Sequence, residues 1–154
     1  MVFGSVATDT GGMNSNNNYT SVFVVDDSPL IRERLVDMLT EVGGVSVVGQ
    51  AESPIEAIEG IIRTNPDFVV LDIHLRFGSG FDVLRGVRFR EIRTTFIVLT
   101  NFPNLLYRTA YLAAGVDYFL DKSAEFDKLV EIIASRTTKH HDRRIALSRR
   151  REVS

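Results

Sequence analysis

Short, continuous runs of apolar and β-branched residues recur along the chain and alternate with longer segments of helical periodicity. A strand covered on both faces reads as a continuous apolar run, whereas a strand with one wet face alternates apolar and polar residues. Five such runs separated by five helical segments predict an α/β domain with a parallel sheet between helices. The predicted strands span residues 21–25, 45–51, 68–73, 95–100 and 116–120.

The intervening segments carry helix start and stop signals. Ser28-Pro29 and Ser53-Pro54 each place a capping residue before a proline at the first helical position. Further helices are predicted after Gly80, from Pro103 to Gly115, and from about Ser123. The helix after Pro103 is expected to face the sheet with Leu106, Ala110, Ala113 and Ala114.

The chain length of 154 residues and the 44% hydrophobic content suit one globular domain. Residues 1–19 have no apolar period and are expected to form a disordered leader. Residues 20–137 form the predicted domain, and residues 138–154 a basic tail. Residues 136–154 hold seven Lys/Arg and two acidic residues, a balance of +5, so the net charge of -2 leaves -7 on the preceding residues. We expect a solvated tail, with contact to nucleic acid or an acidic partner as the alternative.

Several classes of protein are disfavoured by composition. The absence of cysteine excludes disulfides and thiolate metal sites. No apolar run reaches the roughly 18–20 residues of a membrane span, and the N-terminus lacks the pattern of a secretory signal. The sequence therefore predicts a cytoplasmic protein without a membrane partner.

Five polar side chains fall at the ends of four predicted strands. The first strand runs into Asp26 and Asp27, the third contains Asp72 near its end, the fourth ends at Thr100 and the fifth runs into Lys122. Ligands of open α/β sheets bind at the carboxyl ends of the strands, so these groups are expected to converge there.

Three adjacent carboxylates repel one another unless a cation lies among them. An all-oxygen ligand set selects a hard cation, and Mg²⁺ fits best because it takes one or two carboxylates and favours phosphate oxygens. With the charge shielded, Asp72 is a candidate nucleophile for a phosphoryl group. Thr100 and Lys122 are candidates to contact the other phosphoryl oxygens.

These residues resemble the response regulator receiver family of two-component signalling, over about residues 20–137. The acidic pair, Asp72, Thr100 and Lys122 stand in the family's order, and Gly80 and the segment GVDYFLDK (Gly115–Lys122) also fit. The resemblance implies a flavodoxin-like, doubly wound sheet of five strands in the order 2-1-3-4-5. It also implies Asp72 as phosphoacceptor.

The resemblance assigns further roles. Asp27 and Asp72 would bind Mg²⁺ directly, Asp26 through water, and His74 through its backbone carbonyl. Phe119 would be the switch aromatic that turns inward when Thr100 moves toward the phosphoryl group; its alternative role is a plain core residue. The His74 side chain, two residues beyond Asp72, would influence the lifetime of the phosphoryl group or be a solvated loop residue.

The chain departs from the family pattern at two positions. Arg76 stands where the family often has proline, four residues after the phosphoacceptor. Ser123 stands where a cis proline usually follows the lysine, and a cis bond before serine costs several times more than one before proline.

The expected output is conformational, through the face of the fourth helix, fifth strand and fifth helix, to an unknown downstream protein or a homodimer. The phosphoryl donor would be a histidine kinase or phosphotransfer protein, and the chain would catalyse only its own phosphorylation and dephosphorylation. No DNA-binding domain is expected after the fifth helix. The candidate contact residues on that face are Leu105, Tyr107, Arg108, Tyr111 and Leu112.

Three alternatives remain open. A phosphatase with an aspartyl-phosphate intermediate would normally carry its nucleophile after the first strand, with a second aspartate two residues on. A flavodoxin-like flavin or nucleotide binder would need a Gly/Ser/Thr-rich phosphate loop after the first strand, which is absent. A degenerate receiver that acts only as a binding module is disfavoured because every acceptor residue is present.

Overall fold

The computed structural model describes residues 19–88 and 90–137. Five parallel strands form one sheet in the order β2-β1-β3-β6-β7. With only these five strands numbered, the order is 2-1-3-4-5, so the predicted flavodoxin-like topology is confirmed. The strands are β1 (Thr20–Val25), β2 (Val45–Ala51), β3 (Phe68–Leu71), β6 (Thr95–Thr100) and β7 (Tyr118–Asp121).

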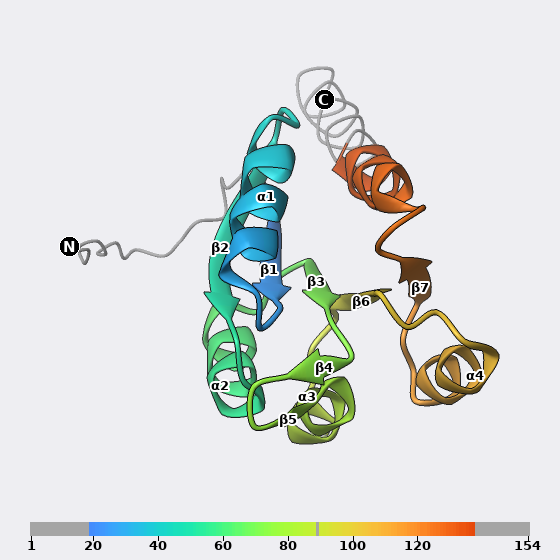
Figure 1. The fold of residues 1–154 in the computed structure, drawn as a ribbon. Coiled ribbons are helices and arrows are strands. Elements are labelled where there is room, and N and C mark those ends of the chain that lie inside the picture. Colours follow the sequence, from blue (N-terminus) through green and yellow to red (C-terminus); the bar gives the residue numbers. More distant parts are fainter. Residues whose placement is uncertain (1–18, 89, 138–154) are drawn as a thin grey trace, which may run out of the picture.

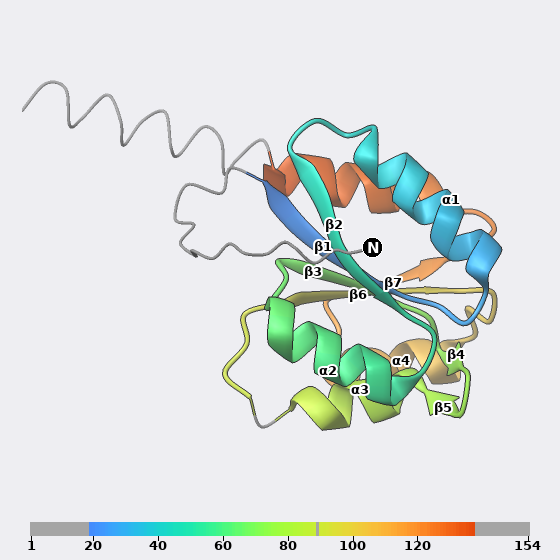
Figure 2. The same ribbon diagram turned by 90° about the vertical axis from the view of Figure 1, so that its left-hand side faces the viewer.

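Helices cover both faces of the sheet, which explains why the strands read as continuous apolar runs. One face carries α1 together with a fifth helix over residues 126–137, and the other carries α2, α3 and α4 (Figures 1 and 2). The bounds are α1 (Pro29–Thr40), α2 (Pro54–Thr64), α3 (Gly80–Val87) and α4 (Leu105–Ala113).

The two faces of the sheet bury separate cores because successive strand residues point to opposite sides. On β1, Val22 and Val24 pack with the α1 residues Leu35 and Leu39 in one cluster. Phe23 belongs to the other cluster, which includes residues of α2 and α3. The central strands are therefore packed on both faces, and their carboxyl ends lie together at one edge of the sheet.

The segment after β3 contains a feature that the sequence reading missed. A two-stranded hairpin, β4 (His74–Leu75) and β5 (Gly78–Ser79), comes before α3. At its turn Phe77 adopts a positive φ of 65°, a left-handed conformation that is uncommon for a residue with a side chain. The third strand is also shorter than expected, because β3 ends at Leu71 and Asp72 follows it.

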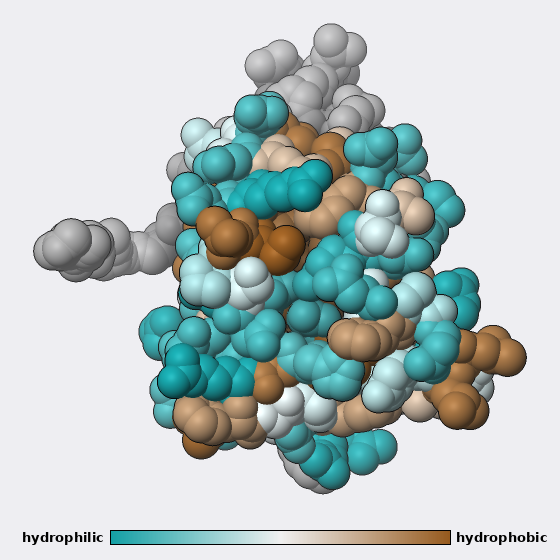
Figure 3. All heavy atoms as spheres, in the orientation of Figure 1, coloured by the Kyte–Doolittle hydropathy of each residue, from teal (hydrophilic) through white to brown (hydrophobic). Residues whose placement is uncertain are grey.

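The prediction for the inner face of α4 was wrong. Leu106 is 83% exposed, and Ala110, Ala113 and Ala114 are also exposed. The one buried residue of α4 is Tyr111, which the sequence reading had placed on the outer face. The buried Tyr111 ring is the main anchor of the helix, with the partly buried Tyr107 packed against the same core, so the small residues beside them need not reach the sheet. Hydrophobic atoms gather where Figure 1 places α4 (Figure 3).

Residues 1–18 of the leader expected over residues 1–19, and the basic tail over residues 138–154, lie outside the described residues. Within the two described ranges, no helix is long and apolar enough to cross a membrane. These ranges also contain no cis peptide bond, so Ser123 follows Lys122 through a trans bond.

Candidate functional site

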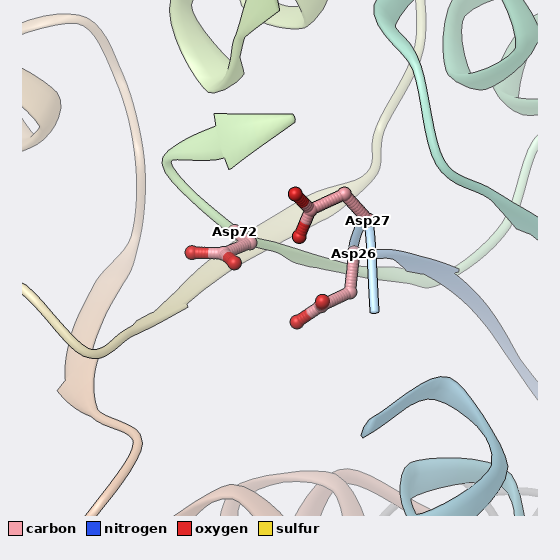
Figure 4. Close-up of side chains that lie close together, drawn as sticks. All are labelled: Asp26, Asp27 and Asp72. Carbon is pink, nitrogen blue, oxygen red and sulfur yellow. The ribbon is translucent and has the colours of Figure 1, made fainter. Parts of the chain in front are cut away.

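The polar residues singled out in the sequence lie at the carboxyl edge of the sheet. Asp26 and Asp27 follow β1, Asp72 follows β3, Thr100 is the last residue of β6, and Lys122 follows β7. The three aspartates project to the same side of this edge (Figure 4). Parallel pairing of β1 with β3, and of β3 with β6, brings strand ends that are far apart in sequence next to one another.

The acidic cluster has the chemistry of a site for a hard cation. Asp26, Asp27 and Asp72 each offer a carboxylate oxygen, and these oxygens lie within 4.8 Å of one another. Asp26 and Asp72 are buried while Asp27 is exposed, and no described residue donates a hydrogen bond to the Asp27 carboxylate. A free carboxylate beside two buried ones fits the oxygen ligand set of Mg²⁺.

Lys122 partly neutralises the cluster. Its buried Nζ donates a hydrogen bond of 2.7 Å to Asp26 Oδ2 and one of 3.1 Å to Asp72 Oδ2. Burial by itself would lower the pKa of Lys122, but the hydrogen bond to Asp26 and the charge of Asp72 outweigh it and raise the pKa. The ammonium group therefore stays charged and ties β7 to β1 and β3.

The surroundings of Asp72 affect both the pKa and the position of its carboxyl group. Burial raises the pKa of its carboxyl above the ordinary value, Lys122 opposes that rise, and the charge of Asp26 adds to it. The backbone N–H of Ile73 donates to Asp72 Oδ1 at 2.7 Å. Asp26 makes two further contacts through its oxygen atoms: its Oδ1 accepts from Ser28 N–H at 2.9 Å, and its carbonyl accepts from Arg32 at 2.6 Å.

The Thr100 hydroxyl is fully buried and accepts a hydrogen bond from the backbone N–H of Phe102 at 3.0 Å. This contact connects the end of β6 to the loop that leads into α4. The backbone carbonyl of Thr100 also accepts from Lys122 N–H at 2.8 Å. Thr100 is thus joined to both the lysine segment and the α4 segment.

Gly80 and Tyr111 form a contact behind Asp72 that the sequence reading missed. A Cβ atom at Gly80 would lie 2.9 Å from the carbonyl oxygen of Asp72 and 3.0 Å from the Tyr111 hydroxyl, so a larger residue does not fit. The Tyr111 ring stacks on Phe81 with centroids 3.9 Å apart. The spacing of eight residues between Asp72 and Gly80 signalled the glycine, but nothing local signalled the tyrosine.

The Tyr111 hydroxyl is buried without a hydrogen-bond partner among the described residues. Burial raises its pKa to about 12, and the nearby backbone N–H of Phe81 acts against that rise without completing a hydrogen bond. The Tyr111 side chain is therefore neutral, and its hydroxyl oxygen is an unpaired polar atom in the core.

His74 is exposed in β4 and packs edge-on against two aromatic rings. Its ring centroid lies 4.6 Å from that of Phe102 and 6.0 Å from that of Tyr107. Arg76, on the same hairpin, lies over the Phe77 ring and forms an ion pair with Glu52 at 3.7 Å. The loop after Asp72 is thereby packed against the segment that begins α4.

Phe119 is buried in the core, whereas its neighbour Tyr118 is partly exposed. Arg108 of α4 donates to the Phe119 carbonyl at 3.1 Å. After Lys122, the chain turns through hydrogen bonds from Ser123 N–H and its hydroxyl to Asp121 Oδ1, at 2.9 and 2.8 Å. Phe119 already points inward here.

Comparisons with known proteins agree with this geometry. A family model described as the response regulator receiver domain matches residues 22–134. The nitrate/nitrite response regulator protein homolog of Haemophilus influenzae is 32% identical over 114 residues, which are 73% of this chain and 54% of that protein. The DNA-binding transcriptional activator DevR/DosR of Mycobacterium tuberculosis is 36% identical over 112 residues, which are 73% of this chain and 52% of that protein.

Solved structures show the same fold. The signal receiver domain of the putative response regulator NarL from Mycobacterium tuberculosis superposes with a TM-score of 0.71 at 29% identity, over 78% of this chain and 97% of that one. The response regulator domain of Thermotoga maritima CheB shares the fold with a TM-score of 0.68 at 24% identity, over 80% and 97% of the two chains. The chain spans about half the length of the two curated relatives.

Proposed function

Because the chain belongs to the response regulator receiver family, we propose that it accepts a phosphoryl group on Asp72 from a histidine kinase or a phosphotransfer protein. An Asp72 carboxylate oxygen attacks phosphorus, a bond forms between them, and the bond from phosphorus to the donor's histidine nitrogen breaks. The nitrogen leaves with the bonding electrons. The convergence of Asp72 with Asp26, Asp27 and Lys122 carries this proposal.

Asp27, Asp72 and the His74 backbone carbonyl are the groups that would hold Mg²⁺. Asp26 would contact it through water, as the resemblance to the receiver family implies; its two carboxylate oxygens also accept from Ser28 N–H and Lys122 Nζ. When bound, the ion supplies positive charge that offsets the carboxylates and the phosphoryl oxygens. Lys122 and the Thr100 hydroxyl donate to the remaining phosphoryl oxygens.

The switch begins at Thr100. Its hydroxyl gives up its contact with Phe102 N–H when it turns toward the phosphoryl group, and the loop leading into α4 loses a restraint. The output face is α4, β7 and the helix over residues 126–137, where a groove of about 390 Å³ includes Leu112 and Tyr118. Tyr111 is removed from the expected contact residues because it is fully buried. Leu105 and Arg108 remain candidate contact residues on this face, which would bind an unknown protein or a second copy of the chain.

The phosphoryl donor needs a surface around the acidic cluster. Large apolar side chains are exposed along the carboxyl edge of the sheet: Leu30 lies in the first turn of α1, Ile55 lies in the first turn of α2, and Phe77 lies at the turn of the β4–β5 hairpin with 86% of its surface exposed. We assign donor docking to this rim. His74, packed on Phe102 and Tyr107, is placed to limit the access of water to the phosphoryl group. We also propose a cytoplasmic location, as expected from the sequence.

The test is incubation with a small phosphodonor and Mg²⁺, followed by intact-mass measurement. We expect one phosphoryl adduct on the wild type, none on Asp72→Asn, and an adduct on the control Asp37→Asn, which changes an exposed aspartate of α1. Folded wild-type protein that gains no adduct from several donors would overturn the proposal. Release of phosphate from excess donor that persists in Asp72→Asn would instead place the nucleophile elsewhere and favour the phosphatase alternative.

A further inference from the structure

A groove of about 400 Å³ separates α3 from the end of α4. Both helices lie on the same face of the sheet (Figures 1 and 2). The groove is open because α4 ends in small residues: Ala114 and Gly115 form one wall, and neither has a side chain that reaches α3. Its apolar floor consists of Phe81, Leu84, Val87, Ile92 and Phe96.

The rim of this groove is positively charged. Arg85, Arg88 and Arg90 are exposed lining residues, and no acidic residue of the described ranges lines the groove. Arg85 pairs with Asp82 on its own helix. Arg88 and Arg90 form no ion pair with any residue in the described part of the chain. Two guanidinium groups without an ionic partner among the described residues thus lie beside an apolar floor, in a chain whose residues 1–135 carry a net charge of -7.

We propose that this groove, which we call the α3–α4 groove, docks an acidic amphipathic helix of a partner protein. Apolar side chains of such a helix would cover the floor, and its carboxylates would pair with Arg88 and Arg90. The small-residue wall lets another helix approach closely. The floor offers no polar side chains to orient a small ligand, which disfavours a metabolite as the occupant.

The ends of this chain do not have the required chemistry. Residues 138–154 carry six Lys/Arg and two acidic residues, so they share the sign of the groove's rim. Residues 1–18 contain a single acidic residue, Asp9. Charge complementarity therefore points to a segment of another protein.

The α3–α4 groove is also connected to the acidic cluster. Phe81 of its floor stacks on Tyr111, and Tyr111 meets Gly80 against the carbonyl of Asp72. A shift of α4 would change the width of the groove, so docking and phosphorylation would influence each other reciprocally. This coupling rests on the proposed function, whereas docking itself does not.

The experiment is a selection from a displayed library of peptides of about 16 residues, which span roughly 24 Å as a helix. The bait is the full chain without a phosphodonor, so the result does not depend on phosphorylation. Counter-selection uses two baits: Ala114→Leu, which fills the groove, and Arg88→Glu/Arg90→Glu, which reverses its rim. Arg63→Glu, an exposed arginine of α2, is the matched charge-reversal control. Thermal unfolding monitored by circular dichroism verifies that each bait is folded.

We expect enriched peptides with acidic residues and apolar positions at helical spacing. An enriched peptide should shift the amide NMR signals of Leu84, Ile92 and Gly115, bind more weakly at high salt, and lose about tenfold or more in affinity on either groove variant but not on Arg63→Glu. Three outcomes overturn the proposal: no groove-dependent enrichment, enrichment of basic peptides, or signals that shift only around Tyr118 and Ile132. Self-association of the chain that Ala114→Leu abolishes would overturn it in favour of a second copy.

Discussion

Asp72 is buried among charges of both signs, and its ionisation opposes folding. Its pKa is raised by burial, against the influence of Lys122, and the neighbouring Asp26 contributes to the rise. A carboxyl whose pKa is higher in the folded state stabilises the fold at low pH, and this contribution is lost as pH rises through the folded-state pKa. Lys122 keeps its 2.7 Å contact with Asp26 even without a charge at residue 72.

We therefore expect Asp72→Asn to raise the free energy of unfolding at neutral pH by about 1 kcal/mol in the absence of metal. The gain should shrink as pH falls toward the ordinary aspartate pKa of 3.8. Urea unfolding in EDTA across this range measures it, with Asp37→Asn as control. A gain that is independent of pH, or a loss of stability at neutral pH, would contradict this assignment.

Gly80 shows how a single missing Cβ permits the site. Alanine at this position would press on the Asp72 carbonyl and the Tyr111 hydroxyl, at 2.9 and 3.0 Å. We expect Gly80→Ala to lower the free energy of unfolding by about 1–3 kcal/mol, the usual cost of overpacking.

The matched control is Gly43→Ala, because a Cβ atom at Gly43 would meet nothing within 4 Å. Chemical denaturation of both variants should separate them clearly. Equal stabilities would show that the backbone behind Asp72 yields without cost.

At the scale of elements, α4 is attached differently from its neighbours. The helices α1, α2 and α3 each bury two or more side chains, whereas α4 buries Tyr111 alone. A stripe of several apolar side chains usually holds a surface helix, but here the Tyr111 ring stacked on Phe81 is the one fully buried anchor, beside the partly buried Tyr107. An element held by so few buried contacts is expected at the low-stability end of the molecule.

Two substitutions at Tyr111 separate its ring from its hydroxyl. Tyr111→Ala should cost about 3 kcal/mol or more, because it empties the space under α4. Tyr111→Phe should leave the free energy of unfolding unchanged or raise it by about 1 kcal/mol, because the hydroxyl is buried without a partner.

Hydrogen exchange provides the accompanying measurement. The amides of α4 should lose protection in Tyr111→Ala while those of α1 change only with global stability. If both variants destabilise the protein equally, the hydroxyl has a partner that must be identified.

At the scale of the whole molecule, the sheet edge joins strands whose acidic residues repel. Asp26 and Asp27 follow β1 and Asp72 follows β3, so a cation at this edge would bind the folded state and not the unfolded chain. Ligand binding of this kind stabilises a protein by RT ln(1 + [L]/Kd), about 2.7 kcal/mol at a hundredfold excess over Kd.

We expect MgCl₂ to raise the free energy of unfolding and EDTA to reverse the gain. Asp27→Asn should remove most of the increase, because Asp27 is the exposed carboxylate of the cluster. Glu59→Gln, which removes an exposed charge from α2, should retain it. A Mg²⁺ effect that persists in Asp27→Asn would place the cation elsewhere.

The pattern of residues along the chain was enough to predict the sheet and the edge at which the acidic cluster lies. Continuous apolar runs such as β6 are buried on both faces only when helices cover the sheet on both sides. Parallel strands also bring their carboxyl ends to the same edge of the sheet. Asp26, Asp27, Asp72, Thr100 and Lys122 were therefore placed together without coordinates. Local pattern sufficed because strand periodicity and chain order constrain these positions directly.

The surroundings of that edge depend on packing in three dimensions and could not be predicted from the chain pattern. The orientation of α4 depends on competition between Tyr111 and several small or aliphatic residues for the same space, and helical spacing alone does not rank them. The β4–β5 hairpin is too short to leave a periodic signal. The α3–α4 groove exists because α3 and the end of α4, which are distant in sequence, leave the space between them unfilled. Packing between such segments is a property of their arrangement in space, which periodicity along the chain does not encode.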